Sequence, residues 1–136
     1  EELLDAPNAI CMPHLGASTP EAEENCAEMA VDQLRAFLEK GNIVNSVNFP
    51  KTVTDNPLPS GGTRLCIANK NVSGMVSKFS TVLGNANLNI ASMINQNRGN
   101  LAYNIIDVDG KVPDETLDAL RAVADVICVR PIYESA

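Results

Sequence analysis

The chain has no tryptophan, a single histidine and few aromatic residues, which make up 4% of its 136 positions. Its net charge of −7 and its lack of a basic cluster argue against nucleic acid as a partner. It contains no apolar run long enough to cross a membrane, and no signal peptide is expected before the first predicted helix. Hydrophobic residues make up 45% of the chain, so these absences predict a small folded cytoplasmic protein.

Cysteine occurs four times, but in no metal-binding or redox pattern. Cys11, Cys26, Cys66 and Cys128 form no Cys-x-x-Cys pair, and the lone His14 cannot complete a zinc site with such scattered thiols. We therefore predict no metal site, and we expect reduced and mostly buried thiols. Cys66 and Cys128 fall on two predicted strands of one sheet, where a disulfide between them is the less favoured alternative.

Charge and backbone chemistry divide the chain. Residues 1–62 hold ten acidic and three basic side chains, whereas residues 63–136 hold seven of each. Between these halves, residues 50–62 contain three prolines, which restrict the backbone, and end in Gly61 and Gly62, which free it. We predict the end of a larger domain over residues 1–49, a linker with a Gly61-Gly62 hinge over residues 50–62, and a second domain over residues 63–136. A long surface loop inside one domain is the alternative for the linker.

The first part is predicted to be mainly one long helix. Residues 8–12 could form a short strand before the loop 13–17. Ser18 is expected to cap the helix, with Glu21 three residues later as in a capping box. Apolar residues recur at helical spacing through residues 27–38, which predicts an amphipathic helix over 20–40. An extended segment is expected over residues 43–49.

The apolar pattern of residues 63–136 predicts alternating strands and helices. Strands are expected over residues 64–68, 87–96, 101–108 and 125–132, with one helix after the turn 69–74 and another over 114–123. This βαββαβ order is typical of a ferredoxin-like α+β fold, in which two helices cover one face of a four-stranded antiparallel sheet. The other face or an edge strand needs cover, so we expect a homo-oligomer.

Two parts of the chain resemble one enzyme family. Residues 13–22, Pro-His-Leu-Gly-Ala-Ser-Thr-Pro-Glu-Ala, closely resemble the catalytic-histidine segment of D-2-hydroxyacid dehydrogenases. The segment 46–50, Ser-Val-Asn-Phe-Pro, and the glycine pair narrow the resemblance to members that act on 3-phosphoglycerate. The βαββαβ unit resembles the ACT regulatory domain that ends many such enzymes. Because the resemblance covers nearly the whole chain, it implies a C-terminal fragment of such an enzyme.

The resemblance implies a reaction and a catalytic residue. The reaction is the NAD-dependent oxidation of 3-phosphoglycerate to 3-phosphohydroxypyruvate, the first step of L-serine biosynthesis. His14 would be the general acid/base, since an imidazole titrates near neutral pH and can take the hydroxyl proton as hydride leaves. No Gly-x-Gly-x-x-Gly fingerprint occurs, so NAD would be bound by a domain before Glu1, and the chain alone would be inactive. An ordinary loop histidine is the alternative, which the surrounding motif disfavours.

The resemblance also implies a regulatory site. Related dehydrogenases bind serine between paired ACT domains. The resemblance places the matching ligand positions at Asn69, Asn71 and Gly74 of one chain and at Asn89 of its partner. Amides can accept from an ammonium group and donate to a carboxylate, and a side chain at Gly74 is expected to crowd the turn. Serine-inhibited relatives have a histidine where Asn69 stands and Arg-Pro-Gly at residues 72–74, so a weakened or changed affinity is expected.

Other interpretations stay open. The asparagines are nearly as well explained as turn and helix-cap residues. The whole chain could also be a free-standing amino-acid-binding ACT protein, or a module that only drives oligomerisation.

Overall fold

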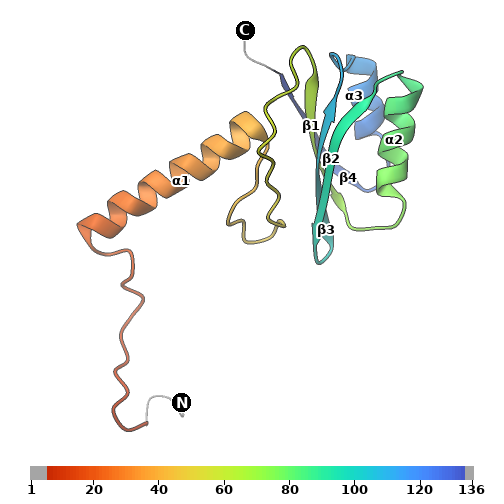
Figure 1. The fold of residues 1–136 in the computed structure, drawn as a ribbon. Coiled ribbons are helices and arrows are strands. Elements are labelled where there is room, and N and C mark those ends of the chain that lie inside the picture. Colours follow the sequence, from red (N-terminus) through yellow and green to blue (C-terminus); the bar gives the residue numbers. More distant parts are fainter. Residues whose placement is uncertain (1–5, 134–136) are drawn as a thin grey trace. The chain divides into compact units, whose positions relative to one another are not determined.

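The computed structural model describes residues 6–133, and its contacts define two compact units with a boundary between Asp32 and Gln33 (Figure 1). The helix α1 (Pro20–Lys40) runs across this boundary. The second unit contains the other elements: β1 (Thr63–Lys70), α2 (Met75–Asn85), β2 (Ile90–Arg98), β3 (Leu101–Val108), α3 (Asp114–Arg121) and β4 (Val126–Tyr133). Residues 41–62, in which the predicted linker lies, belong by their contacts to this second unit.

The first unit confirms the long helix but not its predicted surroundings. The expected strand over residues 8–12 is wrong, because the described part of this unit offers no second strand with which it could pair. Thr19, and not Ser18, caps the helix: its Oγ1 accepts from the backbone N–H of Ala22 at 3.2 Å. That bond satisfies one of the free amide groups of the first turn.

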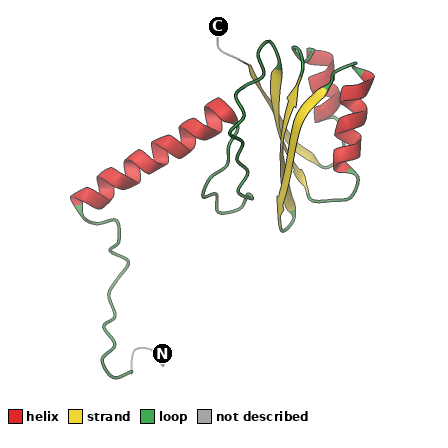
Figure 2. Cartoon of the chain, viewed as in Figure 1, coloured by secondary structure: helices red, strands yellow, loops and turns green. Residues whose placement is uncertain are grey.

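The second unit has the predicted ferredoxin-like α+β fold. Its four strands form one antiparallel sheet in the order β2-β3-β1-β4, and α2 and α3 cover one face (Figure 2). Phe79 and Leu83 of α2 and Leu120 of α3 are fully buried against Leu65 and Ile106 of the central strands. This apolar layer explains why the short helices are stable, since isolated helices of their length are marginal in water.

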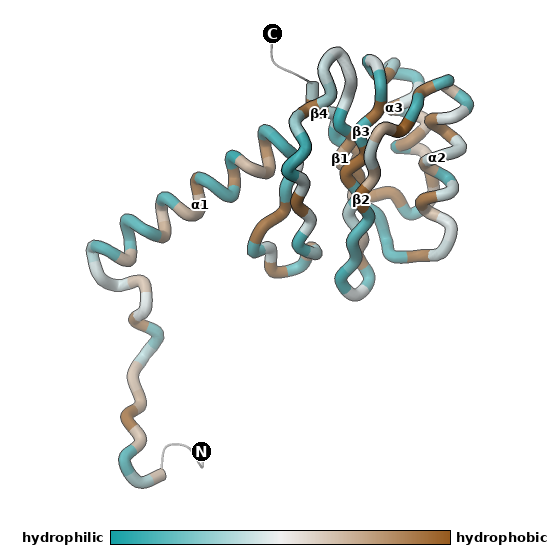
Figure 3. Tube along the Cα trace, viewed as in Figure 1, coloured by the Kyte–Doolittle hydropathy of each residue, from teal (hydrophilic) through white to brown (hydrophobic). Residues whose placement is uncertain are grey.

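The other face of the sheet is covered by residues of the same chain. Ile43, Phe49 and Leu58 pack on a second apolar cluster that includes Tyr103 and Ile105. A single bridge between Ile43 and Thr52 folds this segment back on itself, where a longer extended stretch was predicted. The hydropathy view shows the apolar residues concentrated along the central strands, between these two covering layers (Figure 3).

Arg64 fixes the covering segment to the sheet. Its guanidinium is fully buried and donates to both carboxylate oxygens of Asp107, with distances of 2.7 and 2.9 Å. The same group donates to the backbone oxygens of Lys40, Asn56 and Pro57 at 3.0 to 3.3 Å. One ion pair therefore also satisfies three carbonyl groups at the end of α1 and in the covering segment.

Arg130 of β4 holds the last turn of α1 in a similar way. It donates to the carbonyl oxygens of Phe37 and Leu38, and its guanidinium lies 4.4 Å from the centre of the Phe37 ring. Carbonyl groups at a helix C-terminus have no partner within the helix, and a cation there also interacts favourably with the helix dipole. The end of α1 is thus attached to the sheet by two arginines.

The four cysteines are free, as predicted, but only Cys66 is buried. The expectation of mostly buried thiols is therefore wrong, because Cys11 and Cys26 lie in the unit without a core and Cys128 lies on an edge strand. Cys66 pairs with Arg130 across the β1–β4 ladder, and Cys128 pairs with Ala68. The two cysteines are therefore diagonal neighbours, which lie about 7–8 Å apart, whereas a disulfide needs Cβ atoms about 3.5–4.5 Å apart.

Candidate functional site

His14 lies on the exposed loop that leads into α1. This loop is closed by a hydrogen bond of 3.0 Å from the Ser18 N–H to the Leu15 carbonyl, and α1 begins two residues later. Because the loop is exposed, the His14 imidazole is accessible, as proton transfer to a substrate requires. Among the described residues, no group of three or more His, Cys, Asp or Glu side chains could hold a metal ion.

Asn69 has an internal partner for each end of its amide. It is only 1% exposed at the end of β1, its Nδ2 donates to the Lys70 carbonyl at 2.7 Å, and its Oδ1 accepts from Asn104 Nδ2 at 2.7 Å. A buried amide that has both partners is satisfied without a ligand. The structure therefore places Asn69 beneath the predicted ligand loop and not on its surface.

Asn71 and Gly74 lie on the exposed loop between β1 and α2. The Asn71 side chain donates to the Gly99 carbonyl at 3.1 Å, so its Oδ1 is left as an acceptor. Gly74 precedes α2 with a φ of 82°, and an added Cβ there would meet no atom within 4 Å. The predicted crowding at this position is wrong: glycine is favoured because of the left-handed backbone.

Asn89 lies at the other end of the sheet. It precedes β2, which begins opposite Val108, whereas the ligand loop follows the end of β1, where Lys70 pairs with Leu101. Its Nδ2 donates to Asp109 at 2.7 Å, which leaves its Oδ1 as an acceptor. Within one chain, Asn89 therefore does not meet Asn71 or Gly74, and a ligand could touch both regions only between two copies.

A row of three hydrogen-bonded amides, of which Asn69 and Asn104 are buried, was not foreseen from the sequence. Asn95 donates to Asn104 at 2.5 Å, and Asn104 donates to Asn69, so three asparagines connect β2, β3 and β1 beneath the ligand loop. Asn104 is fully buried between apolar residues of β3. An amide within an otherwise apolar strand was the available signal, since a buried polar group needs such partners. These bonds fix the orientation of Asn69.

Gly61 and Gly62, the predicted hinge, differ in their surroundings. Gly61 is exposed, with a φ of 67°, and an added Cβ would meet nothing within 4 Å. Gly62 is buried, and an added Cβ would lie 2.5 Å from the Val108 carbonyl oxygen and 2.7 Å from Pro59 Cβ. The absence of a side chain at Gly62 is thus required for packing.

We therefore expect Gly62→Ala to lower the free energy of unfolding by about 1–3 kcal/mol, as overpacking does. The matched control is Gly84→Ala, because Gly84 is exposed in α2 and an added Cβ there would touch nothing. Alanine is the better helix former by about 0.5–1 kcal/mol, so this control should be stabilised. Urea unfolding followed by circular dichroism measures both, and equal shifts in the two variants would contradict the packing role of Gly62.

The strand order and the loop geometry define the class of this domain. Residues 63–133 form a ferredoxin-like domain, with the α2 helix starting at a left-handed glycine after β1. No helix among the described residues is long and apolar enough to span a membrane. No protein-family profile matches the chain.

Comparison with curated proteins relates the chain to the D-3-phosphoglycerate dehydrogenases and confirms the recognised resemblance. The chain is 30% identical to the enzyme of that name from Escherichia coli K12 over 133 residues, which are 96% of this chain and 32% of the relative. D-3-phosphoglycerate dehydrogenase 1 of Saccharomyces cerevisiae is 28% identical over 137 residues, covering 97% of this chain and 29% of its own length. The chain thus spans about a third of the length of these relatives.

Solved structures similar to the chain include an ACT domain and a protein without an assigned role. The ACT domain from the GTP pyrophosphokinase of Chlorobium tepidum is 18% identical, with a TM-score of 0.47. The match covers 54% of this chain and 100% of that domain's chain. An unknown protein from Galdieria sulphuraria is 21% identical, with a TM-score of 0.47, and covers 57% of this chain and 48% of its own.

Proposed function

We propose that this chain is the C-terminal part of an NAD-dependent D-3-phosphoglycerate dehydrogenase, which converts 3-phosphoglycerate to 3-phosphohydroxypyruvate. The observation that carries the proposal is the extent of the similarity. An alignment over 96% of the chain includes both the His14 loop and the sheet domain. A resemblance confined to the sheet would have supported only a ferredoxin-like domain, whose fold alone fixes no activity.

In this proposal His14 is the general acid/base. Its exposed position before α1 allows an imidazole nitrogen to reach a substrate hydroxyl supplied from outside this chain. The imidazole takes the hydroxyl proton while the carbinol carbon loses hydride, and it returns the proton in the reverse reaction. NAD, bound by residues outside this chain, supplies the hydride acceptor.

The sheet domain is proposed to bind an amino acid, with L-serine as the first candidate, between two copies. The exposed amides near Gly74 at the start of α2 suit a carboxylate, and the free Oδ1 atoms of Asn71 and Asn89 suit an ammonium group. Because Asn89 lies at the opposite end of the sheet from Asn71, a two-fold pairing along the β2 edge would bring the two regions together. The same pairing would cover the unpaired edge of β2.

We expect L-serine to bind the paired chain and to bind the Asn89→Ala variant at least tenfold more weakly, because the variant lacks one ammonium acceptor. The measurement is isothermal titration calorimetry, with sedimentation velocity to establish the paired state. Asn25→Ala is the matched control, since Asn25 is an exposed residue of α1 in the first unit and does not belong to the sheet domain. Equal heat from wild type and Asn89→Ala, or no heat from either, would contradict this site.

A further inference from the structure

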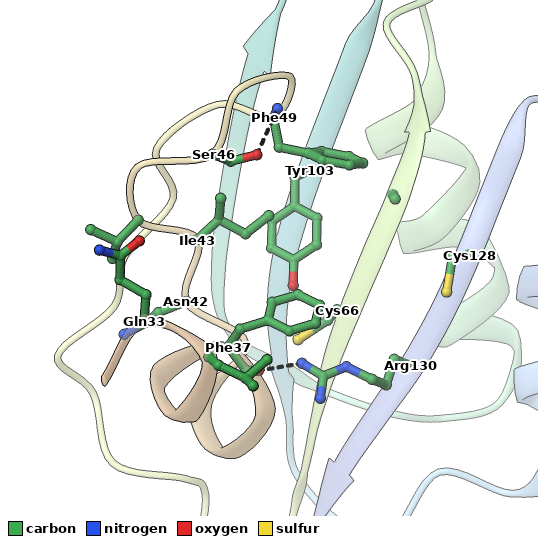
Figure 4. Close-up of a pocket in the computed structure, with 13 residues that line it drawn as sticks. Gln33, Phe37, Asn42, Ile43, Ser46, Phe49, Cys66, Tyr103, Cys128 and Arg130 are labelled. Carbon is green, nitrogen blue, oxygen red and sulfur yellow. Dashed lines mark hydrogen bonds between the residues drawn. The ribbon is translucent and has the colours of Figure 1, made fainter. Parts of the chain in front are cut away.

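The sheet face opposite α2 and α3 carries a pocket of about 480 Å³ (Figure 4). It lies between the sheet, the last turns of α1 and residues 42–49, all within the second unit. Phe37, Phe49 and Tyr103 line it, together with Cys66 and Ala68 of β1. Its volume is in the range of small-molecule sites, which is roughly 300–1,000 Å³.

The buried polar groups of this pocket are already paired within the protein. Asn42 exchanges two hydrogen bonds with the backbone of Thr54, at 3.0 and 3.2 Å. The Tyr103 hydroxyl donates to the Gly41 carbonyl at 2.9 Å. A ligand in the pocket would therefore find apolar contacts and few free hydrogen-bond partners.

The pocket also offers few charged groups to a ligand. Burial raises the pKa of the Cys66 thiol and the pKa of the Tyr103 hydroxyl, so both groups are neutral at physiological pH. Among the described residues of the lining, Arg130 is the one with a charged side chain, and it already donates to two carbonyl groups at the end of α1. A cationic ligand would lose its hydration here with no carboxylate in the described lining to replace it, and an anionic ligand would have to compete with the two carbonyl groups for Arg130.

We propose that this pocket binds a small neutral ligand built around an aromatic ring. Three aromatic side chains line the pocket, and Phe49 and Tyr103 already meet edge to face, with centroids 6.1 Å apart. Such walls can receive a further ring in the same geometry. A bound ring would contact α1, the 42–49 segment and the sheet together, so it would stabilise the attachment of α1 to the sheet. This site lies on the other face from α2 and does not depend on the proposed dehydrogenase or serine functions.

Indole is a suitable probe because the chain contains no tryptophan. Its fluorescence, excited at a wavelength that tyrosine does not absorb, should shift to the blue in a saturable manner when indole is titrated with the protein. Ala68→Phe, which fills the floor of the pocket, should abolish the shift, whereas Ala119→Phe on the exposed surface of α3 should retain it. Tryptamine and indole-3-acetate, the charged analogues, should bind at least tenfold more weakly than indole.

A second measurement keeps the proposal testable if Ala68→Phe does not fold. In the wild-type chain, indole should move the amide resonances of Ile43 and Ala68 and leave those of Thr116 and Leu120, on the buried side of α3, unchanged. Saturable binding with this pattern supports the site. Unsaturable partitioning, shifts spread over both faces, or equal binding by a folded Ala68→Phe variant would overturn it.

Discussion

In the proposed dehydrogenase, replacing His14 by glutamine should lower kcat for 3-phosphoglycerate oxidation by about 10²- to 10⁴-fold, which is the usual contribution of a positioned general acid/base. Glutamine has a similar size and can form hydrogen bonds, but it cannot take up the hydroxyl proton. KM should change little, because this proton moves mainly in the transition state. Steady-state kinetics with 3-phosphoglycerate and NAD measures both parameters.

Glu21→Gln is a suitable control for this experiment. Glu21 is an exposed residue in the first turn of α1, seven positions after His14, and is given no catalytic role. It should retain nearly full activity, apart from a small effect on helix stability. If the His14→Gln enzyme is as active as this control, His14 is not the general acid/base, and the exposed loop has no catalytic role in the proposed reaction.

The second large effect is expected at Arg64. Arg64→Ala leaves the Asp107 carboxylate buried without its counterion, and breaking a buried ion pair in this way typically costs about 3–5 kcal/mol of stability. Urea unfolding should therefore show a midpoint far below that of the wild type. Arg121→Ala is the matched control, because Arg121 pairs with Asp118 on the exposed surface of α3. Exposed pairs contribute roughly 0–1 kcal/mol, so similar losses in the two variants would contradict this interpretation.

A double variant separates the two roles of Arg64. Arg64→Met with Asp107→Leu removes both charges and should recover much of the lost stability. It cannot restore the hydrogen bonds to the Lys40, Asn56 and Pro57 carbonyls. Relative to the wild type, the double variant should therefore accelerate amide hydrogen exchange more in residues 41–57 than in the strands. Equal changes in the segment and in the strands would show that Arg64 does not hold this segment.

The fold of residues 63–133 could be predicted because its signals are local. Apolar residues recur at every second position in the strands and at every third or fourth position in the helices, and this spacing determines which side of each element faces the core. The turn at Gly99 determines where the chain reverses between β2 and β3. The predicted start of β2 was wrong: the strand begins at Ile90, not at residue 87, because Asn87 adopts a left-handed φ of 55°, which is incompatible with a strand.

The features that sequence reasoning missed depend on contacts between distant residues. Nothing near Arg64 indicates that it is fully buried, since its partner Asp107 lies 43 positions away. The amide row through Asn104 and the packing of Ile43 on the sheet are likewise set by strand register and shape. His14 was singled out from its surrounding motif, and its role as general acid/base stays a prediction, because no substrate or cofactor contact is described around it.

The covering of the second sheet face has a practical consequence for anyone shortening this protein. A version that starts at Thr63, where the sheet begins, would lose Ile43, Phe49 and Leu58 and would expose Tyr103, Ile105 and Ile132 to water. An uncovered apolar face of this kind favours self-association. A soluble truncation should therefore begin near Gln33, well before the first strand.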